Sequence, residues 1–289
     1  GKTAVTGSRD KTAIVWDTKT GEKIATIPEH STWVDNVAAS KDGSIVLSSD
    51  RSTHKVWDKS TGKIQSLELG KYLSSLDLST DGTKIAGVNE KDIFLWDLKT
   101  GEKLPTTFGT TSSALHASWH PKDQQLFIGS ANHSGVLVGV DGKITSLSEH
   151  AGAATSSSWS NDGSQLLTGD HGSHGALWDT TTAKLQQKYR SNLGEVTSVS
   201  LSKDGSQVVL GDRGNKALLY EVKNPEKSVQ ALGCPYLMTV VAWSPNSERV
   251  LVAAGKSIQL FDPKTGERTK GFDSYLGHVL SASWSHDGT

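Results

Sequence analysis

The chain has 289 residues and carries 30 Lys or Arg against 31 Asp or Glu, a formal net charge of −1. This balance excludes a bulk positive field that would attract nucleic acid or an anionic membrane surface. Its one cysteine, Cys234, cannot form an intrachain disulfide, and no run of about 18 apolar residues could span a membrane, so we expect a monomeric cytoplasmic protein without a nucleic-acid or membrane partner.

An aromatic residue followed by an acid returns along the chain with a period of about 41 residues, as in repeat architectures. From the N-terminus, residues 2–28 have the pattern of three β-strands, and the first aromatic-acid pair closes the middle one. Residues 136–141 hold a degenerate copy, and seven periods fit the chain length. The clear copies are Trp16-Asp17, Trp57-Asp58, Trp96-Asp97, Trp178-Asp179, Tyr220-Glu221 and Phe261-Asp262.

Two turn signals recur with the same period as these pairs. Asp-Gly, as in Asp42-Gly43, separates β-type runs such as 34–40 and 45–48, because a tight hairpin turn needs positive φ. Thr-Gly follows the aromatic-acid pair, as in Thr20-Gly21, and leads into a further run at 23–27. Each period therefore holds four strands and no helical pattern, which predicts an all-β protein.

Four-stranded units of this length with an aromatic-Asp close resemble the WD40-repeat family, and the resemblance covers essentially the whole chain. It implies a seven-bladed β-propeller of four-stranded antiparallel blades, with strands a to d running from the central channel outward. The chain opens with strands b, c and d of one blade (residues 1–28) and ends with a lone strand a at 279–285, within residues 275–289. We therefore expect one propeller domain over residues 1–289, with its first blade shared by the two ends of the chain.

Eight of the nine tryptophans have an expected packing position between neighbouring blades. Four lie near the end of strand c, and four occupy one repeated position in strand a. Each such ring, when fully buried, contributes roughly 2–3 kcal/mol. These residues are Trp16, Trp57, Trp96 and Trp178 in strand c, and Trp119, Trp159, Trp243 and Trp284 in strand a.

The resemblance also implies a buried polar relay in each blade, formed by a His before strand a, a Ser or Thr in strand b, an Asp in the b–c turn and the strand-c Trp. His30 and His150 match the His position, but Arg51 and Gly172 stand at the turn-Asp position of their blades, and Tyr275 replaces the His of the first blade. We therefore expect no blade with a complete relay, a modest stability, and a divergent or engineered member of the family.

Motifs that could carry chemistry are few. His171 with His174, and His116 with His120, have metal-like spacings, but residues four apart along a strand lie about 13 Å apart, too far for one ion. Only Asp35 is charged among the residues that begin the inner strands, whereas a calcium site needs six or more oxygens. No nucleophile elbow and no phosphate-binding loop occur. We expect no metal, no cofactor and no catalysis.

The d–a loops and b–c turns of such a propeller converge on one face, the top face, where relatives usually meet their partners. Aromatic residues and Arg dominate interface energetics. Trp33, the ninth tryptophan, lies just before strand a, and it either contacts a partner or folds back over its own blade. The predicted partner-binding residues are Arg9, Trp33, Arg51, Tyr72, His171, Arg213, Tyr236 and Tyr275.

Three functional hypotheses follow. The first is a non-catalytic scaffold that binds a protein or peptide through the top face. The second is a designed, reconstructed or fragment-assembled propeller with no evolved partner, because the chain starts at Gly1 and its one methionine, Met238, is internal. The third is a small-ligand binder or enzyme at the channel mouth. Because one fold hosts many functions, the step from propeller to protein binding is an analogy.

Overall fold

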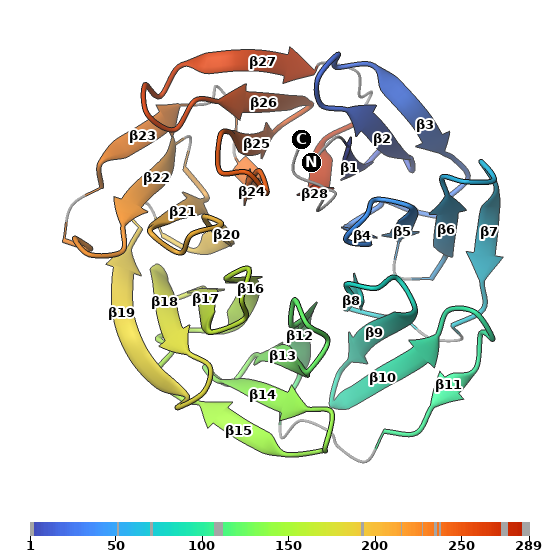
Figure 1. Ribbon diagram of the computed structural model, residues 1–289, viewed down its shortest axis with the longest axis horizontal. Helices are drawn as coiled ribbons and strands as arrows, with labels where there is room; N and C mark the ends of the chain where they lie inside the picture. The colour runs from blue at the N-terminus through green and yellow to red at the C-terminus, as the bar shows by residue number, and fades with distance from the viewer. Residues whose placement is uncertain are drawn as a thin grey trace.

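The computed structural model shows a ring of seven four-stranded sheets around a central channel (Figure 1). It describes residues 3–50, 52–69, 72–106, 112–191, 194–214, 216–226, 228–233, 236, 238–272 and 277–284. Within these ranges there is no helix that could cross a membrane. The expectation of an all-β, seven-bladed propeller is confirmed.

Each sheet is an antiparallel meander whose first strand borders the channel and whose last strand lies at the rim (Figure 1). We number the blades 1 to 7, beginning with the shared one. Blade 1 is β28 (Val279–Trp284), β1 (Thr3–Ser8), β2 (Ala13–Asp17) and β3 (Lys23–Ile27). Blades 2 and 3 are β4 (Asn36–Ala39), β5 (Ile45–Ser49), β6 (His54–Asp58) and β7 (Ile64–Leu67), then β8 (Ser75–Leu78), β9 (Lys84–Asn89), β10 (Asp92–Asp97) and β11 (Lys103–Leu104).

The remaining four blades repeat the pattern. Blades 4 and 5 are β12 (Ala114–Trp119), β13 (Gln125–Ser130), β14 (Gly135–Gly139) and β15 (Ile144–Leu147), then β16 (Ala154–Trp159), β17 (Gln165–Asp170), β18 (His174–Asp179) and β19 (Lys184–Arg190). Blades 6 and 7 are β20 (Val196–Leu201), β21 (Gln207–Asp212), β22 (Lys216–Glu221) and β23 (Gln230–Gly233), then β24 (Met238–Trp243), β25 (Val250–Ala254), β26 (Ser257–Phe261) and β27 (Arg268–Phe272).

The two ends of the chain close the ring in one sheet. Strand β28 pairs antiparallel with β1, in a register that puts Trp284 opposite Ala4 and Ser281 opposite Gly7. The other side of β1 pairs with β2, so the inner edge of blade 1 is covered by the C-terminal strand. The predicted shared blade is therefore confirmed.

Local side-chain hydrogen bonds explain why the acid of the aromatic-acid pair recurs. In blade 1 the Asp17 Oδ1 atom accepts hydrogen bonds from the backbone N–H groups of Lys19 and Thr20, both at 2.8 Å. Gly21 then takes a φ of 81°, a left-handed conformation that costs little without a Cβ. This turn leads the chain from β2 into β3, as the sequence pattern predicted.

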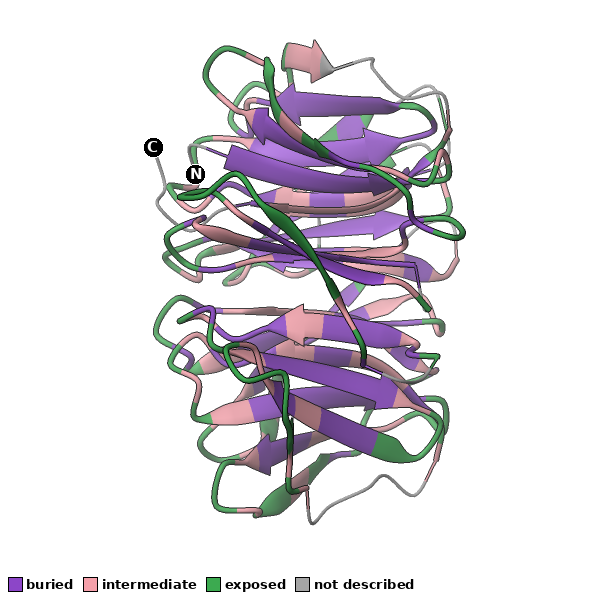
Figure 2. Ribbon diagram, turned by 90° about the vertical axis from the view of Figure 1, so that its right-hand side faces the viewer, coloured by how far each residue is buried: buried purple, intermediate pink, exposed green. Residues whose placement is uncertain are grey.

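The hydrophobic core lies between neighbouring blades. One cluster, for example, joins Leu47 and Val56 of blade 2 to Leu76, Ile85 and Trp96 of blade 3. Seven of the eight tryptophans with an expected packing position are buried, and Trp159 is partly buried against the core of blades 4 and 5. Figure 2 shows the buried residues concentrated in the strands, whereas exposed residues follow the turns and the outer strand that crosses the front.

Candidate protein-interaction face

Aromatic side chains stand on the top face because their neighbours anchor the chain. Val34 and Leu73, each two residues before the first strand of its blade, are fully buried. The residue just before each points the other way, and Trp33 and Tyr72 are 52% and 54% exposed. Two successive d–a loops therefore carry an exposed aromatic at the same position of the repeat.

Arg9 and Trp33 are predicted site residues of different blades that lie in direct contact. The Arg9 guanidinium carbon lies 4.5 Å from the centre of the Trp33 ring, a cation–π geometry worth roughly 0.5–1 kcal/mol at an exposed site. The backbone holds the pair in place, because Arg9 N donates to His278 O at 2.8 Å and Val34 N donates to Ser8 O at 3.0 Å. Loops of blades 7, 1 and 2 thus meet at this point.

A third exposed aromatic, Tyr236, lies over the b–c turn of blade 7. A Cβ added to Gly255 would come within 2.9 Å of the Tyr236 ring, so this turn leaves room for the ring only because it has glycine there. Gly255 also has a φ of 59°, which favours glycine. Tyr236 remains 56% exposed, and its ring is placed by packing over the turn.

His171 and Arg213 lie in the b–c turns of blades 5 and 6. His171 is exposed, and its backbone N–H donates to Ala153 O at 3.1 Å. Arg213 Nε lies 2.6 Å from Glu195 Oε2 in an ion pair that is largely open to solvent, and such pairs contribute roughly 0–1 kcal/mol. These two residues are on the top face, on separate blades from the Arg9–Trp33 contact. Arg51 and Tyr275 lie outside the described residues.

Sequence reasoning missed three buried aspartates that hold the top-face loops. Asp50, Asp170 and Asp212 each end or follow strand b, and each is nearly fully buried. Each carboxylate accepts a hydrogen bond from the preceding d–a loop and others from its own b–c turn. The loop donors are Thr32 N at 2.6 Å, Ala151 N at 2.8 Å and Ser191 Oγ at 2.7 Å, and the turn donors include Ser52 N, His174 N and Gly214 N.

One of these carboxylates lies beside the polar relay of its blade. In blade 5 the Thr168 Oγ1 atom accepts the indole N–H of Trp178 at 2.9 Å and lies 2.8 Å from His150 Nε2. The acid is Asp170, two residues before Gly172, and it binds the backbone N–H next to His150. His150 Nδ1 lies 3.2 Å from Leu147 O, so the hydrogen bonds of blade 5 join three members of the relay, and the acid binds the loop backbone instead of the histidine ring. The expectation that no blade holds a complete relay stays a prediction. The sequence does contain this acid, at the end of strand b, but the WD40 pattern has its turn Asp two residues later.

Burial controls the titration of this layer. Desolvation lowers the pKa of His30 to about 4, and His30 Nε2 lies 3.0 Å from Ser48 Oγ in blade 2. Burial likewise lowers the pKa of His150. For Asp50, burial acts to raise the pKa, but the N–H groups of Thr32, Thr53 and Ser52 donate to the carboxylate and hold its pKa below the usual value.

His116 and His120, one of the two pairs with metal-like spacing, make contacts with the neighbouring blade. His116 Nε2 lies 2.9 Å from Ser157 Oγ across the junction of blades 4 and 5, and the His120 ring packs edge-on against Trp159 at 5.1 Å. Among the residues that the structure describes, no group of three or more His, Cys, Asp or Glu side chains could hold a metal ion.

The cavity of the channel opens on the bottom face, which the a–b and c–d turns form. Its volume is about 690 Å³, and the a–b turn residues that line it include Lys41, Asn161 and Lys203. The third hypothesis of the sequence analysis considered the residues at the start of the inner strands, which lie at the top mouth. The structure places this cavity at the opposite end of those strands.

The ring of four-stranded blades, the aromatic-acid turns and the Ser/Thr–Trp hydrogen bonds define a WD-repeat β-propeller, a class that typically serves as a scaffold for protein interactions. A family model, WD domain, G-beta repeat, matches residues 21–58. The chain belongs to the WD40-repeat family.

Curated relatives share part of this chain. Nuclear distribution protein PAC1 of Arthroderma otae is 30% identical over a region that covers 44% of this chain and 33% of that protein. Proteins of the same name from Arthroderma benhamiae and Trichophyton verrucosum are each 29% identical, with the same coverage. The matched region thus spans about a third of the length of these relatives.

Proposed function

We propose that the chain is a non-catalytic scaffold that binds a protein or peptide through its top face. The observation that carries this proposal is the exposed Trp33 ring with the Arg9 guanidinium stacked on it, flanked one blade on by the exposed Tyr72. Aromatic residues and Arg are enriched at interface positions that carry most of the binding energy.

The construction of the face supports this proposal. The aromatics sit next to fully buried residues on a closed ring, so a partner would pay little to order them. Buried aspartates tie the neighbouring loops to the b–c turns. Tyr236, His171 and Arg213 extend the proposed surface over blades 5 to 7, and Arg51 and Tyr275 belong to it on sequence grounds.

Cellular context is part of the same proposal. The chain is proposed to act as one propeller domain and as a monomer in the cytoplasm, where its single thiol needs no oxidising compartment. Relatives named nuclear distribution protein carry a similar segment over a third of their length, which fits a propeller that serves as the binding part of a larger protein.

A double variant, Trp33→Ala with Tyr72→Ala, tests the proposal. Each change removes an exposed ring, so we expect the melting temperature to fall by no more than roughly 2–6 °C. Partners retained by the wild-type protein in a quantitative pull-down should be lost by the variant. Ile64→Ala is the matched control, because Ile64 is 41% exposed on the outer strand β7 and lies away from the top face.

A partner set that the double variant and the control retain equally would refute use of the top face. A large loss of melting temperature for Trp33→Ala alone would assign that ring to the packing of its own blade. The same comparison with Arg9→Ala shows whether the guanidinium or the indole carries the contact, since the two side chains stack on one another.

A further inference from the structure

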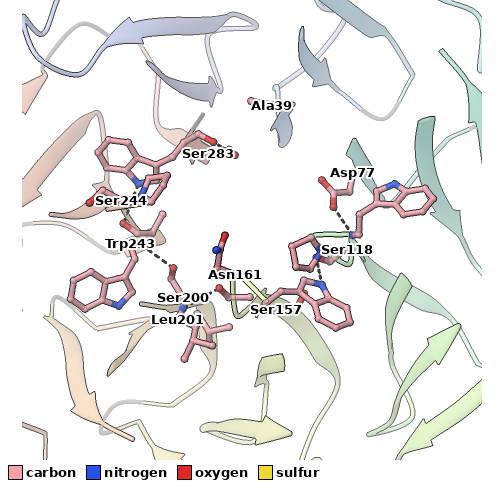
Figure 3. A pocket seen from close by; sticks show the side chains of 18 of the residues that line it. Ala39, Asp77, Ser118, Ser157, Asn161, Ser200, Leu201, Trp243, Ser244 and Ser283 are labelled. Atoms are coloured by element: carbon pink, nitrogen blue, oxygen red, sulfur yellow. Dashed lines mark hydrogen bonds between the residues drawn. The ribbon is translucent and has the colours of Figure 1, made fainter. Parts of the chain in front are cut away.

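The bottom cavity has a polar wall with one acid. Serines on the inner strands of blades 4, 5, 6 and 1 line part of it. Figure 3 shows Ser118, Ser157, Ser200 and Ser283 around the open centre, with the Asp77 carboxylate on the same wall. Asp77 keeps part of its surface open to the cavity, although protein atoms surround it on its other sides.

Asp77 departs from the repeat. It occupies the position just before the strand-a Trp or its equivalent, here Leu78, where the other blades carry only small neutral side chains. Those residues are Ser118, Ser158, Ser200, Ser283, Ala38 and Ala242.

In other blades, a serine at this position is enough to join one blade to the next. Ser158 Oγ accepts the backbone N–H of Leu201 at 3.0 Å, and Ser200 Oγ accepts that of Trp243 at 2.9 Å, so each serine ties one blade to the next. Asp77 Oδ2 makes the same bond to Trp119 N at 2.8 Å. A serine would therefore suffice between blades 3 and 4, and the carboxylate adds a charge that the junction does not need.

Of the described residues that line the cavity, the charged ones are Asp77 on the wall and Lys41 and Lys203 in the exposed turns at the rim. The Asp77 carboxylate has one N–H donor on each oxygen, Trp119 N and Leu78 N, and each carboxylate oxygen can accept a second bond. Burial raises the pKa of Asp77 to about 7, and the nearby Asp123 carboxylate adds to the rise. An ionised Asp77 therefore lacks a counter-ion inside the cavity.

We propose that this cavity binds an organic cation, an alkylammonium or alkylguanidinium group, with Asp77 as its counter-ion. Such a group donates hydrogen bonds to the carboxylate oxygens, and hydroxyls of neighbouring blades line the space around it. A hard metal ion fits less well, because it needs six or more oxygen ligands and the wall offers one carboxylate. The site lies at the mouth opposite the top face and is independent of the proposed scaffold function.

The test uses n-butylguanidinium as the probe, with n-butylurea as its neutral analogue of the same shape. Amide NMR signals of Leu78 and Trp119 report directly on Asp77, since both N–H groups donate to it. We expect saturable shifts of these two signals with the guanidinium and none with the urea. In Asp77→Ser the affinity should fall about tenfold or more, as expected when a buried charge pair is lost.

Two controls separate binding from folding. Ser75→Ala removes another hydrogen bond between blades 3 and 4, from Ala117 N at 3.2 Å, at a residue that does not line the cavity, and it should keep the affinity of the wild type. A short capped peptide with one internal Arg tests whether the cation can also come from a protein chain, and saturable shifts with either probe support the site. If Asp77→Ser fails to fold, the pH dependence of the wild-type affinity shows whether Asp77 is the counter-ion.

The affinity of the wild-type protein for n-butylguanidinium should rise between pH 5.5 and pH 8.5, because the guanidinium stays charged while Asp77 ionises. The titratable side chains on the strands packed against β8 are Lys84 of β9 and His116 of β12, with Asp123 in the neighbouring a–b turn. Burial lowers the pKa of His116 to about 4, below this window. Absence of saturable shifts with both probes, equal affinity for the urea, or a flat pH profile would overturn the proposal.

Discussion

At the scale of single residues, two titratable groups with shifted pKa values respond to pH in opposite directions. His30 is held neutral by burial, and the pKa of its folded state is about 4 instead of 6.5. Burial raises the pKa of Asp77 to about 7 from 3.8. The unfolded chain therefore gains protons on His30 as pH falls below 6.5, and loses a proton from Asp77 as pH rises above 3.8.

The His30 effect predicts acid sensitivity. A depressed histidine pKa means that stability is complete above pH 6.5 and is lost as pH falls towards 4, on the order of 2 kcal/mol for this group. In His30→Gln the fall of the melting temperature between pH 7 and pH 4.5 should be smaller than in the wild type. His171→Gln, at an exposed position, is the control, and an equal fall in all three proteins would contradict the assignment.

The sequence pattern predicted the role of a single residue where that residue interacts with its neighbours along the chain. The Asp17 turn is made within three residues, so the pair Trp16-Asp17 already implies it. The Arg9–Trp33 contact joins residues of two blades, and no local pattern indicates that the two side chains meet. Both residues were predicted for the top face, but as separate positions.

At the scale of elements, the loop between two blades is held by an acid on the next strand b. The Asp170 carboxylate joins Ala151 N of the d–a loop to His174 N of the b–c turn, although these residues are far apart along the chain. In the family pattern the turn Asp of this blade falls two residues later, where this chain has Gly172, so the sequence predicted no acid there. The distance between loop and turn depends on how β16 and β17 pair, which the pattern does not contain.

Replacing Asp170 by Ala should expose this dependence. Two part-buried N–H groups would lose their charged acceptor, which costs roughly 1.5–3 kcal/mol, and hydrogen exchange at Ala151 and His174 should quicken. Asp179→Ala is the matched control, because Asp179 makes similar backbone bonds in an exposed turn of the same blade. Equal loss of stability in both variants, measured by thermal melting, would show that burial of the acid is unimportant.

At the scale of the whole molecule, ring closure decides stability. Strand β28 covers the inner edge of blade 1 and brings the buried Trp284 against Leu251 and Leu260 of blade 7. Without it, an open ring would expose an unpaired strand edge. Closure also brings blade 7 next to blade 1, and so places the loops that carry Tyr236 near those that carry Arg9.

Deleting residues 279–289 should therefore lower the melting temperature by roughly 10 °C or more, since loss of a buried tryptophan alone costs about 3–5 kcal/mol. A synthetic peptide of residues 277–289, added in trans, should restore part of the loss in differential scanning calorimetry. An unchanged midpoint, or no recovery with the peptide, would refute the view that the ends close the ring.

The amino-acid sequence by itself determined the strand repeat, the number of blades and the shared first blade. Those follow from turns such as Asp17 to Gly21 and from tryptophans such as Trp16, whose roles depend on residues nearby or on a fixed period. Only the tertiary structure showed that Arg9 contacts Trp33, that Asp170 holds the loop before its blade, and that the Asp77 carboxylate lies in the bottom cavity. Each of these depends on side chains from different strands or blades, and their separation is set by sheet pairing and ring closure, not by distance along the chain.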